Sequence, residues 1–358
     1  IAAAEEERFL RDKHAKGRMA YHATQFCIKQ AGITPKDIDI VAFPYSEIDL
    51  TSPARWHYAK RYWYAPDRGL TAIFNGNRRY KRNHESVMKL LDDLGIGADR
   101  VKFVPVEHHL AHASSAYHLS GFKEKTAIIG IDGKGEYATT FFGYGENGQI
   151  HKIKEFYDPD SLGGMYGALT EFLGFEMLDG EFKVMGMAPY GDPTRFDFSQ
   201  LIEFGDGEFR VNTELVNTLG ARRYKKDGKG YFFSQKLLDW LGPMRGGDEI
   251  DDPYIDYAAS IQDLLEKTAL HLIEYHLGDI IRETGKVCFA GGVALNVKLN
   301  QRIIAMDGVK ELFVQPAASD AGTAIGAASY ASHMAGVPVE KMEHVYLGPA
   351  FTTEECIA

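Results

Sequence analysis

The stretch that decides the fold is Thr126-Ala-Ile-Ile-Gly-Ile-Asp132, which runs directly into Gly133-Lys134-Gly135. A short apolar run that ends in a carboxylate and a glycine-rich turn is typical of a buried strand in an α/β sheet. Residues 137–144 and 150–156 follow as two further strands, and Asn147-Gly148 between them indicates a hairpin turn. We therefore expect a sheet centred on residues 126–131, with Asp132 at the edge where α/β folds place ligand groups.

Helix and strand patterns alternate on both sides of this stretch. Upstream we expect a helix at 21–32, strands at 39–43 and 101–106, and a small-residue helix from His108. Downstream we expect a helix at 255–277, strands at 287–290 and 311–314, and loops over the polar, glycine-rich residues 200–250. The alternation predicts an α/β fold with two lobes and a cleft between them, with 1–150 as the first lobe and 151–345 as the second.

Composition limits the kinds of partner. The chain has 358 residues, and its 50 acidic and 40 basic residues give a net charge of −10. This balance argues against nucleic acid or an anionic membrane as a partner of the whole surface. No apolar run approaches the ~20 residues of a membrane helix. Cys27, Cys288 and Cys356 are too few for a disulfide framework or a cysteine zinc site, so we expect a reducing, cytoplasmic setting.

Residues 51–85 differ from the rest and read as an insertion in the first lobe. Between Arg55 and Arg82 lie eight basic residues and one acidic residue, so this part carries +7 and the remainder −17. Aromatic residues alternate with the charges: Trp56, Tyr58, Tyr62, Trp63, Tyr64, Phe74 and Tyr80. One interpretation is a surface that meets an anionic or ring-shaped partner. The interpretation we favour is a helical hairpin whose aromatic side chains pack inward and whose arginines face water.

Two histidines and two aspartates could form a metal site. His108 and His112 are four residues apart, so they share one face of a helix. Asp132 and Asp320 each lie just beyond an apolar strand. Such a pair of histidines is more often structural than metal-binding, but two imidazoles with one or two carboxylates would suit Fe(II), Mn(II) or Zn(II).

Glycine turns could hold a phosphate group. Gly291-Gly292-Val-Ala-Leu-Asn296 follows a strand and opens a helix, so its amides could bind phosphate with help from the helix dipole. The turn Asp132-Gly133-Lys134-Gly135-Glu136 could do the same, and Lys183 could neutralise phosphate charge. Each of these features taken alone could equally be an ordinary turn glycine or a surface lysine.

A family resemblance joins these features. The sequence resembles the O-carbamoyltransferases of the nodulation protein U and antibiotic-biosynthesis type. The matching segments are Ala3–Phe9 with Lys13-His14, His108–Ala116, Ile131–Glu136 through Thr140, Ser161–Gly163, Lys183–Gly191, Gly291–Asn296, and Gln315-Pro-Ala-Ala-Ser-Asp320-Ala-Gly. The resemblance implies a two-lobed, ribonuclease H-like fold of the actin, sugar-kinase and chaperone-ATPase type. It also implies transfer of a carbamoyl group from carbamoyl-adenylate to a hydroxyl of a small molecule beside an iron ion.

The resemblance also implies roles for single residues. The metal ligands would be His108, His112, Asp132 and Asp320. The adenylate would lie near Lys13, Gly163, Gly292, Asn296 and Ser319, in addition to the turn residues Gly133, Gly135, Glu136 and Gly291 and to Lys183. We identify no general base in the chain, and the resemblance places it in an N-terminal strand that precedes Ile1.

Both ends of the sequence read as the ends of a fragment of the large N-terminal domain. Residues 346–358 would begin a linker to a further domain that makes carbamoyl-adenylate from carbamoyl phosphate and Mg²⁺·ATP. The expected partners are the small-molecule acceptor, that domain and, as an option, a second copy of the chain in a homodimer. The alternatives are a transferase that places threonylcarbamoyl groups on tRNA, a sugar-kinase-like ATPase, and a nucleotide-binding interaction module.

Overall fold

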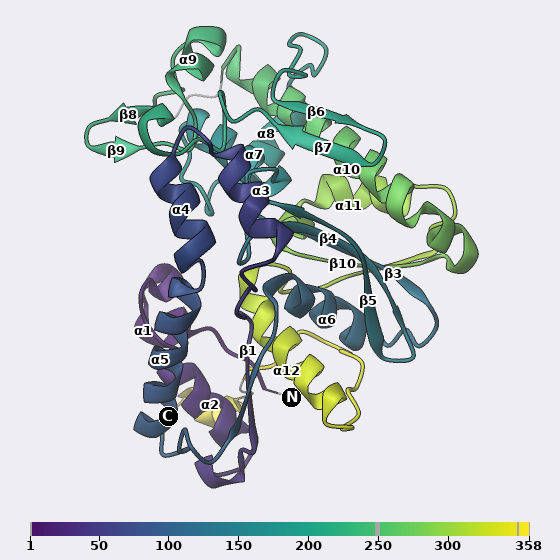
Figure 1. Cartoon of the computed structure of the whole chain (residues 1–358). Helices are drawn as coiled ribbons and strands as arrows, with labels where there is room; N and C mark the ends of the chain where they lie inside the picture. Colours follow the sequence, from purple (N-terminus) through teal and green to yellow (C-terminus); the bar gives the residue numbers. More distant parts are fainter. Residues whose placement is uncertain (1, 248–250, 349–350, 358) are drawn as a thin grey trace.

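A five-stranded sheet runs through the middle of the computed structural model, which describes residues 2–247, 251–348 and 351–357 (Figure 1). The strand order is β11-β10-β3-β4-β5. The strands are β3 (Thr126–Ile131), β4 (Ala138–Glu146), β5 (Gln149–Tyr157), β10 (Lys286–Ala290) and β11 (Glu311–Val314). β10 is parallel to β3 and β11, whereas β4 pairs antiparallel with β3 and β5. The predicted central strand and hairpin are confirmed, and the carboxyl ends of β3, β10 and β11 meet at one edge.

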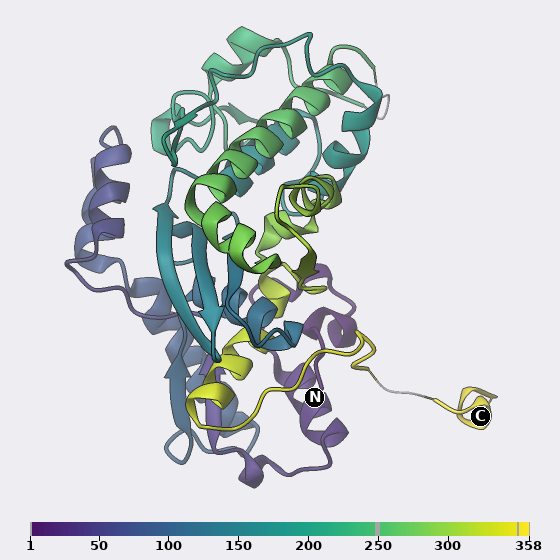
Figure 2. The same cartoon turned by 90° about the vertical axis from the view of Figure 1, so that its right-hand side faces the viewer.

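β3 is buried along its whole length because helices cover both faces of this sheet. Ala127, Ile129 and Ile131 join the core formed with α7 (Leu162–Phe172) and α10 (Tyr254–Thr284). Ile128 points to the opposite face, where it joins the cluster formed by α6 (His108–Ser120). This alternation is the two-residue period of a strand. α12 (Thr323–Met334) packs on α6 and completes the second layer (Figure 2).

The remaining elements form two groups on either side of the main sheet (Figure 1). One group surrounds the parallel pair β1 (Ile40–Phe43) and β2 (Lys102–Pro105) and contains α1 (Glu6–Leu10), α2 (Tyr21–Gln30) and α5 (Arg78–Asp93). The other contains α8 (Glu181–Met187), α9 (Gln235–Leu241) and α11 (Val297–Ile304). The expected α/β class with two lobes is confirmed. The expected boundary at residue 150 falls inside β5, and strand pairing in the main sheet crosses it.

The expectation of loops over residues 200–250 was wrong for two hairpins and for the helix α9. β6 (Ile202–Gly205) pairs with β7 (Glu208–Val211), and β8 (Lys225–Lys226) pairs with β9 (Lys229–Gly230). Asp206-Gly207 and Asp227-Gly228 form the turns, and all four residues have positive φ. Asp-Gly between two strands is a hairpin signal that the polar composition of the segment had obscured.

The insertion at 51–85 is helical, but its side chains do not follow the favoured interpretation throughout. It comprises α3 (Pro53–Arg61), α4 (Pro66–Asn75) and the first half of α5. Tyr58 and Tyr62 are buried, as that interpretation predicts. Three aromatic side chains are instead exposed: Trp56, Trp63 and Phe74. Arg55, expected to face water, is only 2% exposed.

A buried carboxylate at the end of β5 helps to dock the insertion on the main sheet. Asp160 lies just after β5, and its Oδ1 is 2.7 Å from Arg61 Nη2, while its Oδ2 is 2.8 Å from His57 Nε2. Burial raises the pKa of Asp160, but the hydrogen bonds from His57 and Arg61 outweigh burial and leave this pKa below its usual value. α3 is therefore held to the sheet by a buried ionic contact, so its position relative to β5 is defined.

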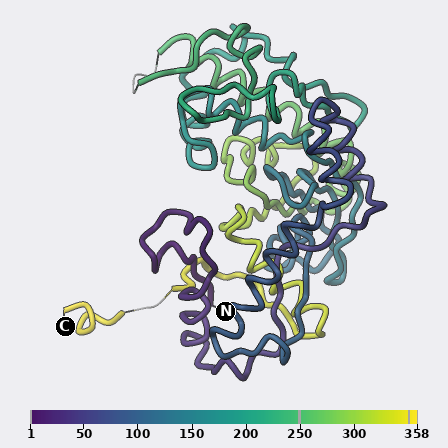
Figure 3. Tube along the Cα trace, turned by 60° about the vertical axis from the view of Figure 1, so that its left-hand side comes forward, coloured from purple at the N-terminus to yellow at the C-terminus, as the bar shows by residue number. Residues whose placement is uncertain are grey.

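The C-terminal segment is described in part. Of the expected linker 346–358, residues 349, 350 and 358 lie outside the described residues, as does Ile1; α13 (Thr353–Ile357) is drawn apart from the body of the chain (Figures 2 and 3). Among the helices in the described part of the chain, none combines the length and apolar composition needed to cross a bilayer.

The contact between α6 and α12 gives a test of the fold. A Cβ at Gly326 of α12 would lie 1.9 Å from the carbonyl oxygen of Ala111 in α6, so Gly326→Ala should push the helices apart. We expect a loss of about 1–3 kcal/mol in the free energy of unfolding, as for other overpacked interfaces. Gly186→Ala in α8 is the control, because that Cβ meets nothing within 4 Å. It should be neutral or stabilising by up to about 1 kcal/mol. Urea unfolding of both variants decides this, and equal midpoints would show that the two helices do not pack as described.

Candidate functional site

α6 presents two histidines on one face at its first two turns. His108 and His112 are 5% and 0% exposed, and their Nε2 atoms are 3.1 Å apart. The start of the helix is anchored because the Glu136 carboxylate accepts hydrogen bonds from the backbone N–H of His108 at 3.2 Å. A carboxylate at this end also complements the positive end of the helix dipole.

Two aspartates from the edge of the main sheet complete the cluster. Asp132 follows β3, and its Oδ2 is 3.4 Å from His108 Nε2. Asp320 lies between β11 and α12, and its Oδ1 is 3.4 Å from His108 Nε2 and 3.8 Å from His112 Nε2. One ligand atom from each of the four residues lies within 4.8 Å of the others. The cluster is open on one side, because the Asp320 side chain is exposed while the other three are buried.

The charges in this cluster depend on one another. Although the Asp320 side chain is exposed on one side, its partial desolvation within the cluster raises its pKa, but hydrogen bonds from His108 and His112 bring this pKa down to about 2. Burial likewise opposes ionisation of Asp132, and hydrogen bonding from His108 with the charges of the histidines lowers its pKa. Burial would lower the pKa of His108, but the two carboxylates raise this pKa to about 10. In the absence of a metal, the proton on His108 therefore compensates two close negative charges.

His109 does not belong to this cluster. Its side chain is 1% exposed, and burial together with the charges of His108 and His112 lowers its pKa to about 3. It is a neutral core histidine under ordinary conditions.

The glycine turns lie directly against the aspartate. The backbone N–H of Gly292 donates to Asp132 Oδ1 at 2.9 Å, which leaves Asp132 Oδ2 facing His108. Gly291 has φ +96, and a Cβ there would lie 2.2 Å from the carbonyl oxygen of Ile131. A Cβ at Gly163 would lie 2.7 Å from the carbonyl oxygen of Asp132. Glycine at both positions is required by close approach of the backbone to the end of β3.

The N-terminus of α7 faces the same turn. Ser161 Oγ donates to the carbonyl oxygen of Gly133 at 2.7 Å and accepts from the N–H of Gly164 at 2.8 Å. This end of an eleven-residue helix therefore lies beside Asp132 and Gly133, where its dipole favours an anion. Ser161 was not among the predicted site residues, although serine before Leu-Gly-Gly is a helix N-cap signal.

The other predicted nucleotide-binding residues fall into two groups. Gly135 and Ser319 lie beside the cluster: a Cβ at Gly135 would be 2.9 Å from His108 Cβ, and Ser319 precedes Asp320. Three others are engaged elsewhere. Lys13 Nζ is 2.8 Å from Asp179 Oδ1, and Lys183 Nζ lies over the ring of Phe175. The Asn296 side chain exchanges two hydrogen bonds with Gln262 and caps α11 through the N–H of Leu299.

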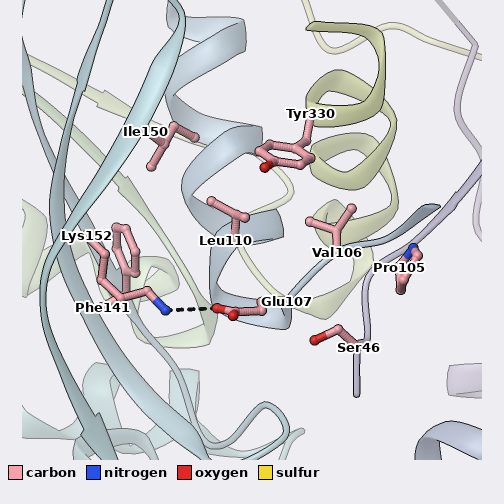
Figure 4. Close-up of a pocket in the computed structure, with 9 residues that line it drawn as sticks. All are labelled: Ser46, Pro105, Val106, Glu107, Leu110, Phe141, Ile150, Lys152 and Tyr330. Carbon is pink, nitrogen blue, oxygen red and sulfur yellow. Dashed lines mark hydrogen bonds and ion pairs between the residues drawn. The ribbon is translucent and has the colours of Figure 1, made fainter. Parts of the chain in front are cut away.

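A cavity of about 370 Å³ lies on the opposite face of α6 (Figure 4). Leu110 and Tyr330 form its apolar walls, and Lys152 reaches across to Glu107 with Nζ 2.8 Å from Oε2. Glu107 and Leu110 face this cavity, whereas His108 and His112 face the aspartates. The two faces of α6 therefore serve separate spaces.

The donor set fits a divalent transition metal. Two imidazole nitrogens and two carboxylate oxygens, with one open side, suit Fe²⁺, Mn²⁺ or Zn²⁺. Such a cation would take the place of the proton that otherwise lies between His108 and the carboxylates.

The electrostatics predict distinct titrations of neighbouring histidines in metal-free protein. His108 should stay protonated up to about pH 10, and His109 should stay neutral down to about pH 3. The pKa of His108 is higher in the folded chain than the value of ~6.5 in the unfolded chain. Its charge therefore stabilises the fold fully below pH ~6.5, and this stabilisation disappears as the pH rises towards 10. NMR titration of ¹⁵N-histidine-labelled, chelator-treated protein measures both values. Titration of either histidine near 6.5 would contradict the described surroundings.

The sequence matches known proteins along nearly its whole length. The family model described as "Carbamoyltransferase N-terminus" matches residues 1–329. "Nodulation protein NolNO" of Sinorhizobium fredii is 32% identical over 371 residues, which cover 100% of the chain and 48% of that protein. "Nodulation protein NolO" of Bradyrhizobium diazoefficiens is 35% identical over 257 residues, which cover 70% of the chain and 43% of that protein. The chain thus spans about half the length of the curated relatives it matches.

Solved structures resemble the chain only distantly. Component A of the (R)-2-hydroxyglutaryl-CoA dehydratase of Acidaminococcus fermentans has a TM-score of 0.39 and 17% identity, covering 66% of the chain and 72% of that structure. Full-length HypF in its phosphate- and nucleotide-bound form has a TM-score of 0.34 and 18% identity, covering 65% of the chain and 43% of that structure.

Proposed function

Because the chain belongs to the carbamoyltransferase family, whose N-terminal part its residues 1–329 match, we propose that it transfers a carbamoyl group from carbamoyl-adenylate to a hydroxyl of a small molecule. The observation that carries this proposal is the cluster of His108, His112, Asp132 and Asp320 beside two glycine turns. In this proposal carbamoyl-adenylate, made elsewhere from carbamoyl phosphate and Mg²⁺·ATP, reaches the chain ready-made.

The four clustered side chains would hold a divalent metal, Fe²⁺ in the first instance, which would act as a Lewis acid on an oxygen of the substrate. The chain's own contribution is to fix these ligands before substrate arrives. Gly292 fixes Asp132 through its backbone N–H, and Glu136 fixes the helix that carries both histidines. Rigid ligands keep one side of the cluster free for the substrate.

The adenylate phosphate would lie at the N-terminus of α7, a backbone site that favours anions and touches Gly133. The N–H groups of Gly291 and Gly292 already donate to the carbonyl oxygen of Ala318 and to Asp132, so this turn would contribute by fixing Asp132. As the acceptor oxygen bonds to the carbamoyl carbon, the bond from that carbon to a phosphate oxygen of AMP breaks. Donors that stabilise charge on the phosphate oxygens would help AMP to depart. Ser161 supports this arrangement by holding Gly133 and the first turn of α7 together.

The metal assignment predicts about one bound metal per chain, as in other sites of three or four protein ligands. His108→Ala and Asp320→Ala should each reduce bound metal below about a tenth of the wild-type content, because too few ligands remain. His151→Ala and Asp307→Ala are the matched controls outside the cluster. Elemental analysis after gel filtration measures the content. Undiminished metal in both cluster variants would refute the assignment.

The donor substrate is tested by calorimetry with a non-hydrolysable sulfamate analogue of carbamoyl-adenylate. Metal-loaded protein should bind the analogue, and Gly163→Ala should weaken binding by at least about tenfold, or ~1.4 kcal/mol, because the added Cβ separates α7 from Gly133. Gly186→Ala, which meets no neighbour, should bind as the wild type does. Failure of the metal-loaded wild type to bind would contradict the proposed donor.

A further inference from the structure

A second cavity, of about 510 Å³, lies between the end of α4 and the start of α5. Its lining carries more positive than negative charge: the basic residues are Arg55, Arg78, Lys81 and Arg82, and the acidic residue is Glu85. Phe74, which is 70% exposed, lies at the same cavity. This is a concentration of positive charge on a chain whose net charge is −10.

The basic side chains of α5 are directed to this cavity by the helix period. Arg78, Lys81 and Arg82 are spaced three and four residues apart and therefore share one face of the helix. In the described part of the chain, none of the three forms an ion pair. Another exposed cation of the same helix is paired, since Lys89 Nζ is 3.0 Å from Asp93 Oδ2. The cavity thus keeps three exposed cations without a carboxylate partner.

The N-terminus of α5 also opens here without a side-chain cap. Asn77 precedes the helix, but its Oδ1 accepts from the backbone N–H of Ile48 at 2.9 Å instead of from the helix. Its Nδ2 donates to the carbonyl oxygen of Ile48 at 3.1 Å. The first N–H groups of this sixteen-residue helix therefore add their partial positive charge to that of the basic side chains.

Arg55 supplies an independent observation from the wall of the cavity. Its guanidinium is buried and donates only to carbonyl oxygens, to Ile73 at 2.8 Å, to Ala72 at 3.3 Å and to Ile48. Its buried Nε has no hydrogen-bond partner among the described residues, and no carboxylate there pairs with its charge. A buried, unpaired charge is costly, and a counter-anion in the adjoining cavity would reduce that cost.

We propose that this cavity binds a phosphate or diphosphate group of a small molecule. Guanidinium and ammonium groups around an uncapped helix N-terminus match the geometry and charge of phosphate oxygens. The exposed ring of Phe74 would contact the organic part of such a molecule.

A short segment of chain connects the cavity to the residue that anchors His108. Ser46 donates its N–H to Glu136, the same carboxylate that anchors His108, and Leu50 lines the cavity. Four residues span at most about 14 Å. Binding at the cavity does not depend on the proposed transfer.

Calorimetry with inorganic pyrophosphate and with UDP tests the inference without any transfer reaction. The test variant is Arg78→Gln/Lys81→Gln/Arg82→Gln, and the matched control is Lys123→Gln/Lys225→Gln/Lys226→Gln, which removes the same charge from exposed positions elsewhere. Wild type and control should bind pyrophosphate alike, and the test variant should lose at least about tenfold in affinity, as expected for lost charge-assisted contacts. Thermal melting checks that both variants are folded, and metal content should be unchanged in both.

The outcomes separate the sources of the phosphate. Tighter binding of UDP than of pyrophosphate, with Phe74→Ala removing that difference, assigns the cavity to a phosphorylated organic molecule. Equal binding of both probes assigns it to free phosphate or diphosphate. Absence of binding to the wild type, or binding that the test variant retains in full, overturns the inference. If the metal-loaded wild type fails to bind the sulfamate analogue but still binds pyrophosphate, only the proposed transfer is refuted.

Discussion

Two carboxylates from distant parts of the chain are held close enough to repel each other, and the site depends on what compensates them. Asp132 and Asp320 each lie 3.4 Å from the same nitrogen of His108. Without a cation, a proton on His108 supplies the compensation, which is why its pKa is raised. A divalent metal would supply more charge at the same place and would draw in His112 as a further ligand. The folded chain thus holds these carboxylates in place for a positive charge before any ligand binds.

The fold provides this arrangement through three parallel strands and one helix. β3 ends at Asp132, β10 ends at the Gly291-Gly292 turn, and β11 leads to Asp320, so the three loops leave the sheet at one edge. α6 packs on the face of the same sheet and brings its histidines to that edge, with α12 behind it. Close approach at Gly163, Gly291 and Gly326 is the structural requirement for this packing. Substitution of these glycines by residues with larger side chains should therefore disturb the site even though the four clustered side chains are unchanged.

Much of the cluster could be predicted from local sequence, because the relevant signals are local. The spacing of His108 and His112 fixes a common helix face, and a carboxylate after an apolar strand points to the sheet edge. The ion pair of Lys13 could not be predicted from local signals of this kind. Its ion pair with Asp179 depends on how two distant segments fold against each other, and no periodicity carries that information. Arg55 was misjudged for a related reason, since its burial follows from α4 supplying the carbonyl oxygens that it binds. Residues 200–250 were predicted as loops from their polar composition, but two Asp-Gly turns form hairpins there and α9 is helical.

In the proposed function, one cation is bound by four side chains at the edge of the main sheet. Crystals of the metal-loaded chain, with diffraction recorded on both sides of the metal absorption edge, would locate this cation. We expect one anomalous peak with His108 Nε2, His112 Nε2, Asp132 Oδ2 and Asp320 Oδ1 at about 2.0–2.3 Å, the usual range for such ligands. A metal held by a different set of residues, with these four side chains still hydrogen-bonded to one another, would contradict it.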